Sequence, residues 1–224
     1  RRCVYETAYD LPRALMPKLV DPGTRLGALL PSVQESTGLR NGDVISVCNH
    51  DTGSAVAAVP AEGEDWAFIS SGTWSNLGAL SREVITTQES FDARMVNELT
   101  LGSLFLARNI MGLWLVQECR RTWEADGKSV GYSEIAGMAG EAEPQVSFIN
   151  PDDPRFFPPG DMVKRVQDFC RETGQPVPEE IGEIARCILE SLALRYRHVL
   201  EKIESLQGDG KIEVLHVVGG GGKN

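Results

Sequence analysis

The sequence lacks an apolar run that approaches the ~20 residues a helix needs to span a membrane. It is also poor in basic residues, with 22 Lys and Arg against 32 Asp and Glu and a formal net charge of −10. Nucleic-acid backbones and anionic membranes are bound by clustered cations, so we expect neither as a partner. A negatively charged ligand would have to be met by local backbone dipoles or by a metal ion rather than by the overall field.

The five cysteines are odd in number and include no Cys-x-x-Cys pair. This usage argues against a disulfide scaffold or a zinc site and is typical of a reduced, cytoplasmic protein. Cys170 and Cys187 are the pair to watch, and for them we rank a packing contact between helices above a disulfide, and a disulfide above a metal site.

The 224 residues have the composition of a folded domain, with 42% hydrophobic and 24% charged residues. Short β-rich runs alternate with helical patterns, and glycine turns follow several of the runs, which is typical of an α/β fold. A glycine run directly follows the last apolar run, so we expect another element after it and a longer protein around this chain. We predict a buried strand at 44–48, two strands joined by a turn at 66–75 and a strand at 212–218, with helices at 32–39, 104–123 and 183–206.

The glycine run at 219–222 suggests phosphate binding, because backbone N–H groups that can be approached closely attract anions. It fails both standard patterns. Lys223 is followed by Asn224 rather than by Ser or Thr, as a P-loop requires, and the dinucleotide pattern needs a third glycine where Asn224 stands. From the pattern alone, a tight structural turn is at least as good an interpretation.

His50, Asp51 and Thr52 directly follow the predicted strand at 44–48. In open α/β folds, residues just past the carboxyl end of a strand face the ligand crevice. A carboxylate there could accept a hydroxyl proton while His50 and Thr52 donate hydrogen bonds to the same substrate. The alternative is that Asp51 only caps the next helix, and the local sequence by itself favours the cap.

The predicted turn Ser71-Gly72-Thr73 can present a backbone N–H and a hydroxyl to phosphate oxygens, or it can be a plain turn. Asn109 and Gln117 lie eight residues apart on the helix predicted at 104–123, about 80° apart around its axis. They could address one cleft, although surface polar residues are the default. No Ser–His–Asp arrangement can be built from the sequence, and we interpret the histidines at 198 and 216 as structural.

Taken together, these segments resemble the FGGY carbohydrate kinases of the actin/hexokinase/Hsp70-like ATPase superfamily. The resemblance implies two ribonuclease-H-like lobes, each a mixed sheet flanked by helices, with sugar and ATP in the cleft between them. Residues 1–43 then correspond to the end of the N-terminal sugar-binding lobe, and 44–224 to most of the C-terminal ATP-binding lobe. The stretches that carry the resemblance are 48–56, 70–75, 108–114 and 216–224, with further matches at 150–156, 170–176 and 185–194.

The resemblance also implies roles for single residues, and it reverses the local preference for a cap at Asp51. Asp51 matches the general base that takes the proton from the 1-hydroxyl of the sugar, and the best-fitting branch of the family uses L-rhamnulose. Mg²⁺ bridging the phosphates would offset the acidic charge of the chain. Residues matching substrate contacts are His50, Asp51, Thr52 and Asn109, and those matching ATP contacts are Ser71, Gly72, Thr73, Gln117, Gly220, Gly221 and Asn224.

One departure concerns the adenine side of the site, where this chain has Gly222-Lys223 before Asn224 and members of that branch often have Cys-Gln.

Three alternatives to this function stay open at this point. The first is a kinase for another ketose such as fuculose, xylulose or ribulose, and the second is a non-catalytic ATPase-fold module. The third, a nicotinamide-dependent dehydrogenase, is remote because the dinucleotide pattern fails.

Overall fold

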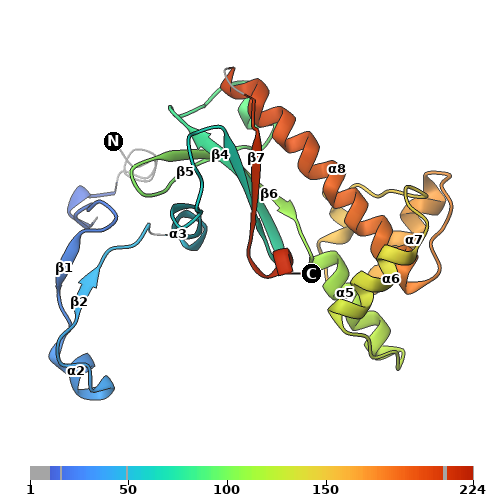
Figure 1. The fold of residues 1–224 in the computed structure, drawn as a ribbon, viewed down its shortest axis with the longest axis horizontal. Helices are drawn as coiled ribbons and strands as arrows, with labels where there is room; N and C mark the ends of the chain where they lie inside the picture. The colour runs from blue at the N-terminus through green and yellow to red at the C-terminus, as the bar shows by residue number, and fades with distance from the viewer. Residues whose placement is uncertain (1–10, 16, 49, 209–210, 224) are drawn as a thin grey trace.

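The protein is described by a computed structural model over residues 11–15, 17–48, 50–208 and 211–223. A central sheet has a group of helices on one side and an extended arm on the other (Figure 1). In chain order the elements are η1 (Arg13–Leu15), β1 (Arg25–Ala28), α2 (Pro31–Thr37), β2 (Asp43–Ile45), α3 (Asp51–Ala57), β3 (Trp66–Ser71), β4 (Trp74–Ser81), α4 (Gln88–Asp92), β5 (Val96–Leu99), β6 (Leu104–Met111), α5 (Trp114–Ala125), α6 (Tyr132–Glu141), η2 (Pro154–Phe156), α7 (Met162–Glu172), α8 (Ile181–Gln207), β7 (Val214–Val218) and η3 (Gly220–Lys223).

The five-stranded sheet has the order β5-β6-β4-β3-β7. Strand β7 pairs in parallel with β3, whereas β3–β4, β4–β6 and β5–β6 are antiparallel. The sheet is therefore mixed, as the expected α/β architecture requires. The predicted hairpin at 66–75 is confirmed as β3 and β4, and the predicted C-terminal strand is confirmed as β7.

Each face of the sheet is covered by a different helix. The long helix α8 lies along one face, where Val199 and Ile203 join a buried cluster with Leu77 and Ile110. On the other face Val56 of α3 belongs to a cluster with Phe68. Because side chains alternate between the faces of a strand, the sheet residues that surround α3 are the odd-numbered positions of β6 and the even-numbered positions of β3 and β4.

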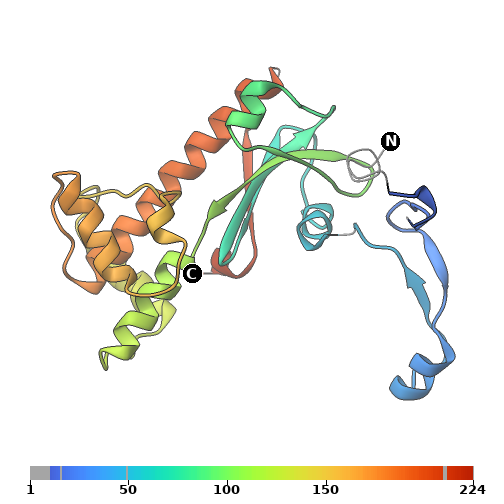
Figure 2. The same cartoon turned by 180° about the vertical axis from the view of Figure 1, so that it is seen from behind.

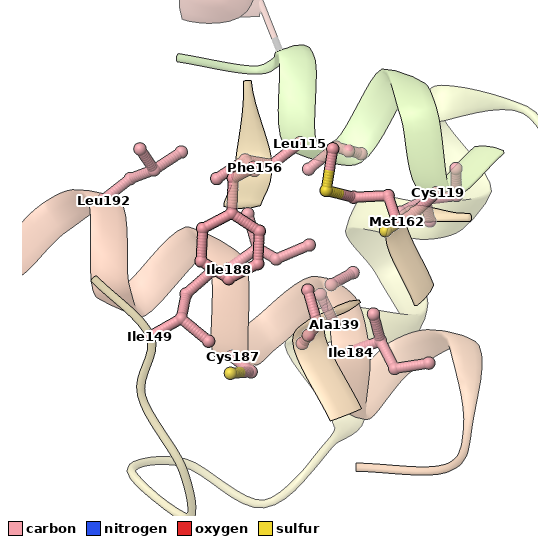
Figure 3. Close-up of a cluster of buried hydrophobic side chains, with 14 of the residues drawn as sticks. Leu115, Cys119, Ala139, Ile149, Phe156, Met162, Ile184, Cys187, Ile188 and Leu192 are labelled. Carbon is pink, nitrogen blue, oxygen red and sulfur yellow. The ribbon is translucent and has the colours of Figure 1, made fainter. Parts of the chain in front are cut away.

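Helices α5, α6 and α7 gather around the N-terminal half of α8 beside the sheet (Figure 2). Their apolar faces meet in a core built around Phe156, which is fully buried and on which residues from several elements converge (Figure 3). Burying a side chain of this size contributes about 2–3 kcal/mol. Cys170 and Cys187 are buried free thiols in this core, so the expected packing contact is confirmed over a disulfide.

The periodicity of residues 183–206 is confirmed by α8, which ends where Gly208 adopts a left-handed conformation with φ 75°. Gly38 ends α2 in the same way. The sequence analysis did not predict α4, β5, α6 or α7. None of the helices in the described ranges combines the length and apolar character of a membrane crossing.

Two predictions about secondary structure were wrong. The strand at 44–48 is not buried: β2 is exposed because it pairs only with β1 in a two-stranded ribbon that no second layer covers. Residues 104–123 are not one helix but β6 followed by α5. Strand β6 is paired on both edges and covered by α8 on one face and α3 on the other, so apolar residues are needed on both faces. Helix α5 begins only after Gly112.

Candidate active site

The turn between β3 and β4 is held against the start of α5. The N–H groups of Leu113 and Trp114 donate to the carbonyl oxygens of Gly72 and Thr73, at 3.0 and 3.1 Å. The hydroxyl of Thr73 donates to Oε1 of Gln117 at 3.2 Å. The turn and the first turn of α5 thus bring together two of the residues predicted to contact ATP.

Gly112 explains why the chain can pass so close to this turn. A Cβ at Gly112 would lie 2.7 Å from the carbonyl oxygen of Gly72 and 2.8 Å from the backbone nitrogen of Ser75. Only glycine allows this approach.

The glycine run after β7 packs against the same turn. Gly219 has φ +91°, and a Cβ there would lie 2.5 Å from the carbonyl oxygen of Ser71, while a Cβ at Gly221 would overlap the hydroxyl oxygen of Ser71. Among the residues that the structure describes, and apart from its own chain neighbours, a Cβ at Gly220 would meet no atom within 4 Å. Gly219 and Gly221 are therefore required by packing, and Gly220 presents an open backbone beside Ser71, Gly72 and Thr73.

Asp51 is the first residue of α3, and its side chain is 96% exposed. Its Oδ1 accepts a hydrogen bond from the N–H of Thr52 at 2.7 Å, with Nε2 of His50 at 3.4 Å. A capping side chain would instead accept from an N–H two or three residues further on, and the cap position is held by His50. The interpretation of Asp51 as a helix cap is therefore wrong, and its carboxylate is free to meet a ligand.

Helix α3 is fixed to the sheet through its buried glycine. A Cβ at Gly53 would lie 2.6 Å from the carbonyl oxygen of Leu99, and the hydroxyl of Thr100 donates to the carbonyl oxygen of Gly53 at 2.8 Å. His50 is oriented by Glu98, whose Oε2 lies 3.1 Å from its Nδ1. The β5–β6 hairpin therefore positions both His50 and the helix that carries Asp51.

A row of polar residues crosses the sheet on the face that α3 covers. Ser70, Asn76 and Asn109 are direct neighbours on β3, β4 and β6. On each strand they lie between the apolar residues beneath α3 and the end of the strand near Thr73. Nδ2 of Asn76 donates to Oδ1 of Asn109 at 2.8 Å. The row thus separates α3 from the β3–β4 turn on one face of the sheet.

Asn109 belongs to this row, and the other predicted site residues that the structure describes form two groups flanking it. Within the described part of the chain, no hydrogen bond or ion pair joins Asp51 to Asn109 or to Thr73. Asn109 lies on β6 and Gln117 on α5, so their predicted placement on one helix was wrong. Asn224 lies outside the described residues.

The sequence analysis missed Asn76. Its signal is an amide three residues after Thr73, directly before a run of apolar and small residues at 77–80. Of the two histidines interpreted as structural, His216 packs edge-on against Trp66 with ring centroids 5.6 Å apart, whereas the histidine at 198 is exposed on α8. Among the residues that the structure describes, no group of three or more His, Cys, Asp or Glu could hold a metal ion.

This fold and its glycine-rich turn match a known class of proteins. The profile of the FGGY family of carbohydrate kinases, C-terminal domain, matches residues 67–224. The chain belongs to this family. Among curated proteins, it is 47% identical over 92% of its length to a rhamnulokinase of Bacteroides thetaiotaomicron, and 45% identical over 94% to a rhamnulokinase of Enterococcus faecalis.

The chain spans 42% of the length of each of these two relatives. Among solved structures, the xylulose kinase from Rhodospirillum rubrum covers 97% of this chain with a TM-score of 0.69 and 16% identity, and this chain covers 43% of that structure. The Plasmodium falciparum glycerol kinase with ADP covers 94% with a TM-score of 0.65 and 16% identity, and this chain covers 41% of it. These structural likenesses confirm the expected fold.

Proposed function

We propose that the full-length protein transfers the γ-phosphoryl group of ATP to the 1-hydroxyl of L-rhamnulose, giving ADP and L-rhamnulose 1-phosphate in rhamnose catabolism. The observation that carries this proposal is the 47% identity to a rhamnulokinase across 92% of the chain. Phosphoryl transfer to an alcohol needs a group that accepts the hydroxyl proton and a site that binds the phosphates. On one lobe, the exposed carboxylate of Asp51 fits the first need and the open glycine turn fits the second.

Thr73, Gln117 and Gly220 are the proposed contacts to ATP, together with Ser71, Gly72 and Gly221 and, on the adenosine side, Asn224. The open backbone at Gly220 is the feature that fits a phosphate, because a side chain there would occupy the space that a ligand needs. The Thr73 hydroxyl can turn from Gln117 to a phosphate oxygen with little rearrangement. Mg²⁺, when bound together with ATP, would neutralise phosphate charge.

Asp51 is the proposed general base, and it accepts the proton of the attacking hydroxyl. His50, Thr52 and Asn109 orient the sugar, so that this hydroxyl lies in line with the phosphoryl group. The contact between His50 and Glu98 keeps the imidazole in place beside Asp51.

We propose that residues 1–43 end the sugar-binding lobe and that 44–224 form the ATP-binding lobe. The arm formed by β1, α2 and β2 carries several exposed apolar side chains, among them Leu19 at 87%, Leu30 at 67% and Leu39 at 61% exposure. Such side chains suit a surface that another lobe covers. A cytoplasmic location is proposed as well, because the four described cysteines are free thiols, as expected in a reducing compartment.

Steady-state phosphorylation of several ketoses by the full-length protein tests the proposed activity. We expect kcat/KM for L-rhamnulose to exceed that for L-fuculose, D-xylulose and D-ribulose by at least about tenfold, because buried polar groups reject a sugar that leaves them unpaired. Preference for another ketose would favour a different member of the family. ATP hydrolysis that no sugar stimulates would favour the non-catalytic module.

Gly220→Ala tests the nucleotide contact separately from folding. We expect KM for ATP to rise about tenfold, which corresponds to about 1.4 kcal/mol, while the melting temperature stays unchanged, because no protein atom lies within 4 Å of the new Cβ. The matched variant Gly219→Ala should instead lose stability, by about 1–3 kcal/mol, because its φ is +91° and its Cβ would meet Ser71. An unchanged KM for ATP in Gly220→Ala would remove Gly220 from the site.

A further inference from the structure

Asn76 is a buried amide in the middle of β4. It is 7% exposed, and the next three positions of the strand, Leu77, Gly78 and Ala79, are buried and apolar or small. An apolar side chain at this point of the sheet would avoid the cost of removing an amide from water. The presence of asparagine therefore needs an explanation other than core packing.

The amide of Asn76 is only partly satisfied. Its Nδ2 donates to Oδ1 of Asn109 at 2.8 Å, but its Oδ1 is shielded from solvent and has no hydrogen-bond partner among the described residues. An unpaired buried acceptor costs about 1–3 kcal/mol. Groups of this kind in folded proteins call for a specific reason, and a role in function is one of them.

The single hydrogen bond that Asn76 makes has a direct consequence for Asn109. It occupies the Oδ1 acceptor of Asn109, so the Nδ2 donor of that exposed side chain is left for a ligand. Without this bond the Asn109 amide could rotate and present either its donor or its acceptor. Asn76 thus selects which of the two hydrogen-bonding groups of Asn109 faces outward.

We propose that Asn76 is a positioning residue for the sugar: it holds the Asn109 amide with Nδ2 outward, as a donor to a hydroxyl oxygen of the ketose. This inference rests on the proposed function, in which Asn109 contacts the substrate. Asn76 acts through Asn109, and its own unpaired Oδ1 lowers the stability of the folded protein. The ATP contacts at Thr73 and Gln117 do not depend on this pair.

Two variants at position 76, each made alone and in combination with Asn109→Ala, test the proposal in the full-length enzyme. The first expectations concern the single variants. Asn76→Leu keeps the branched shape and removes both polar atoms, and Asn76→Ala serves if leucine prevents folding. We expect KM for L-rhamnulose to rise about three- to tenfold, as for the loss of one hydrogen bond, with KM for ATP within twofold. The melting temperature of Asn76→Leu should be unchanged or higher, because the unpaired acceptor is gone.

The double variant separates positioning from a general structural role. If Asn76 acts through Asn109, adding Asn76→Leu to Asn109→Ala changes KM for the sugar no further, whereas independent effects multiply. Multiplied effects, an unchanged sugar KM in Asn76→Leu, or equal losses toward ATP and sugar would each overturn the inference. A wild-type enzyme that phosphorylates no ketose would instead overturn the proposed function and this inference with it. An Asn109→Ala variant that behaves as wild type would leave the proposed activity standing but remove the sugar contact on which this inference rests.

Discussion

Asp51→Asn in the full-length enzyme should lower kcat for sugar phosphorylation by about 10²–10⁴-fold, the usual contribution of a general base. The amide has nearly the shape of the carboxylate but cannot accept the proton of the sugar hydroxyl. Stability should not change, because the side chain is 96% exposed and bonds only to groups of its two sequence neighbours. Steady-state kinetics with both substrates varied, together with a melting curve, would measure these effects.

The matched control is Asp65→Asn, which makes the same chemical change at an exposed position before β3. It should keep wild-type kcat and both KM values. ATP binding by Asp51→Asn, measured by calorimetry without sugar, should stay within about threefold of wild type, since no proposed phosphate contact is altered. Turnover near the wild-type value in Asp51→Asn would reject Asp51 as the base, whatever the activity proves to be.

Periodicity and turn chemistry predicted those elements whose local pattern agrees with their place in the fold. The amphipathic repeat of α8, the glycine that ends α2 and the hairpin of β3 and β4 are of this kind. Strand β6 is the instructive failure. It is apolar on both faces because strands pair on both its edges and helices cover both faces, so it has no alternation that distinguishes it from a buried helix.

Candidate site residues could be selected from the sequence where a residue type has one characteristic chemical use. They could not be selected where the pairing of distant strands decides which side chains meet. The turn at Thr73 and the acid at Asp51 could be selected from the sequence as candidates, although only the resemblance favoured a base over a cap at Asp51. The pairing of Asn76 with Asn109 depends on the register between β4 and β6, which are joined through a helix and another strand. No local pattern contains that register, so Asn76 was missed.

An ion cluster on the face of the sheet that α8 covers is also formed by residues far apart in the sequence, and its loss should have the largest effect on stability. Oδ2 of Asp152, in the connector between α6 and α7, accepts from Arg108 of β6 at 2.7 Å and from Arg195 of α8 at 2.6 Å. The three side chains are 12–18% exposed. Burial, and next the charge of Arg195, lower the pKa of Arg108, so the two guanidinium groups repel each other with Asp152 between them.

Asp152→Asn should therefore destabilise the full-length protein by about 3–5 kcal/mol, because two largely buried cations lose their shared counter-charge. Thermal and urea unfolding would measure the loss. Glu201→Gln removes one partner of the exposed pair with Arg197 on the same helix and should cost less than about 1 kcal/mol. Adding Arg195→Met to Asp152→Asn removes the surplus cation and should recover part of the loss, since a buried ion cluster replaced by apolar groups is often tolerated. If Asp152→Asn costs no more than Glu201→Gln, the cluster does not hold the connector to the sheet, and the packing around Phe156 must do so alone.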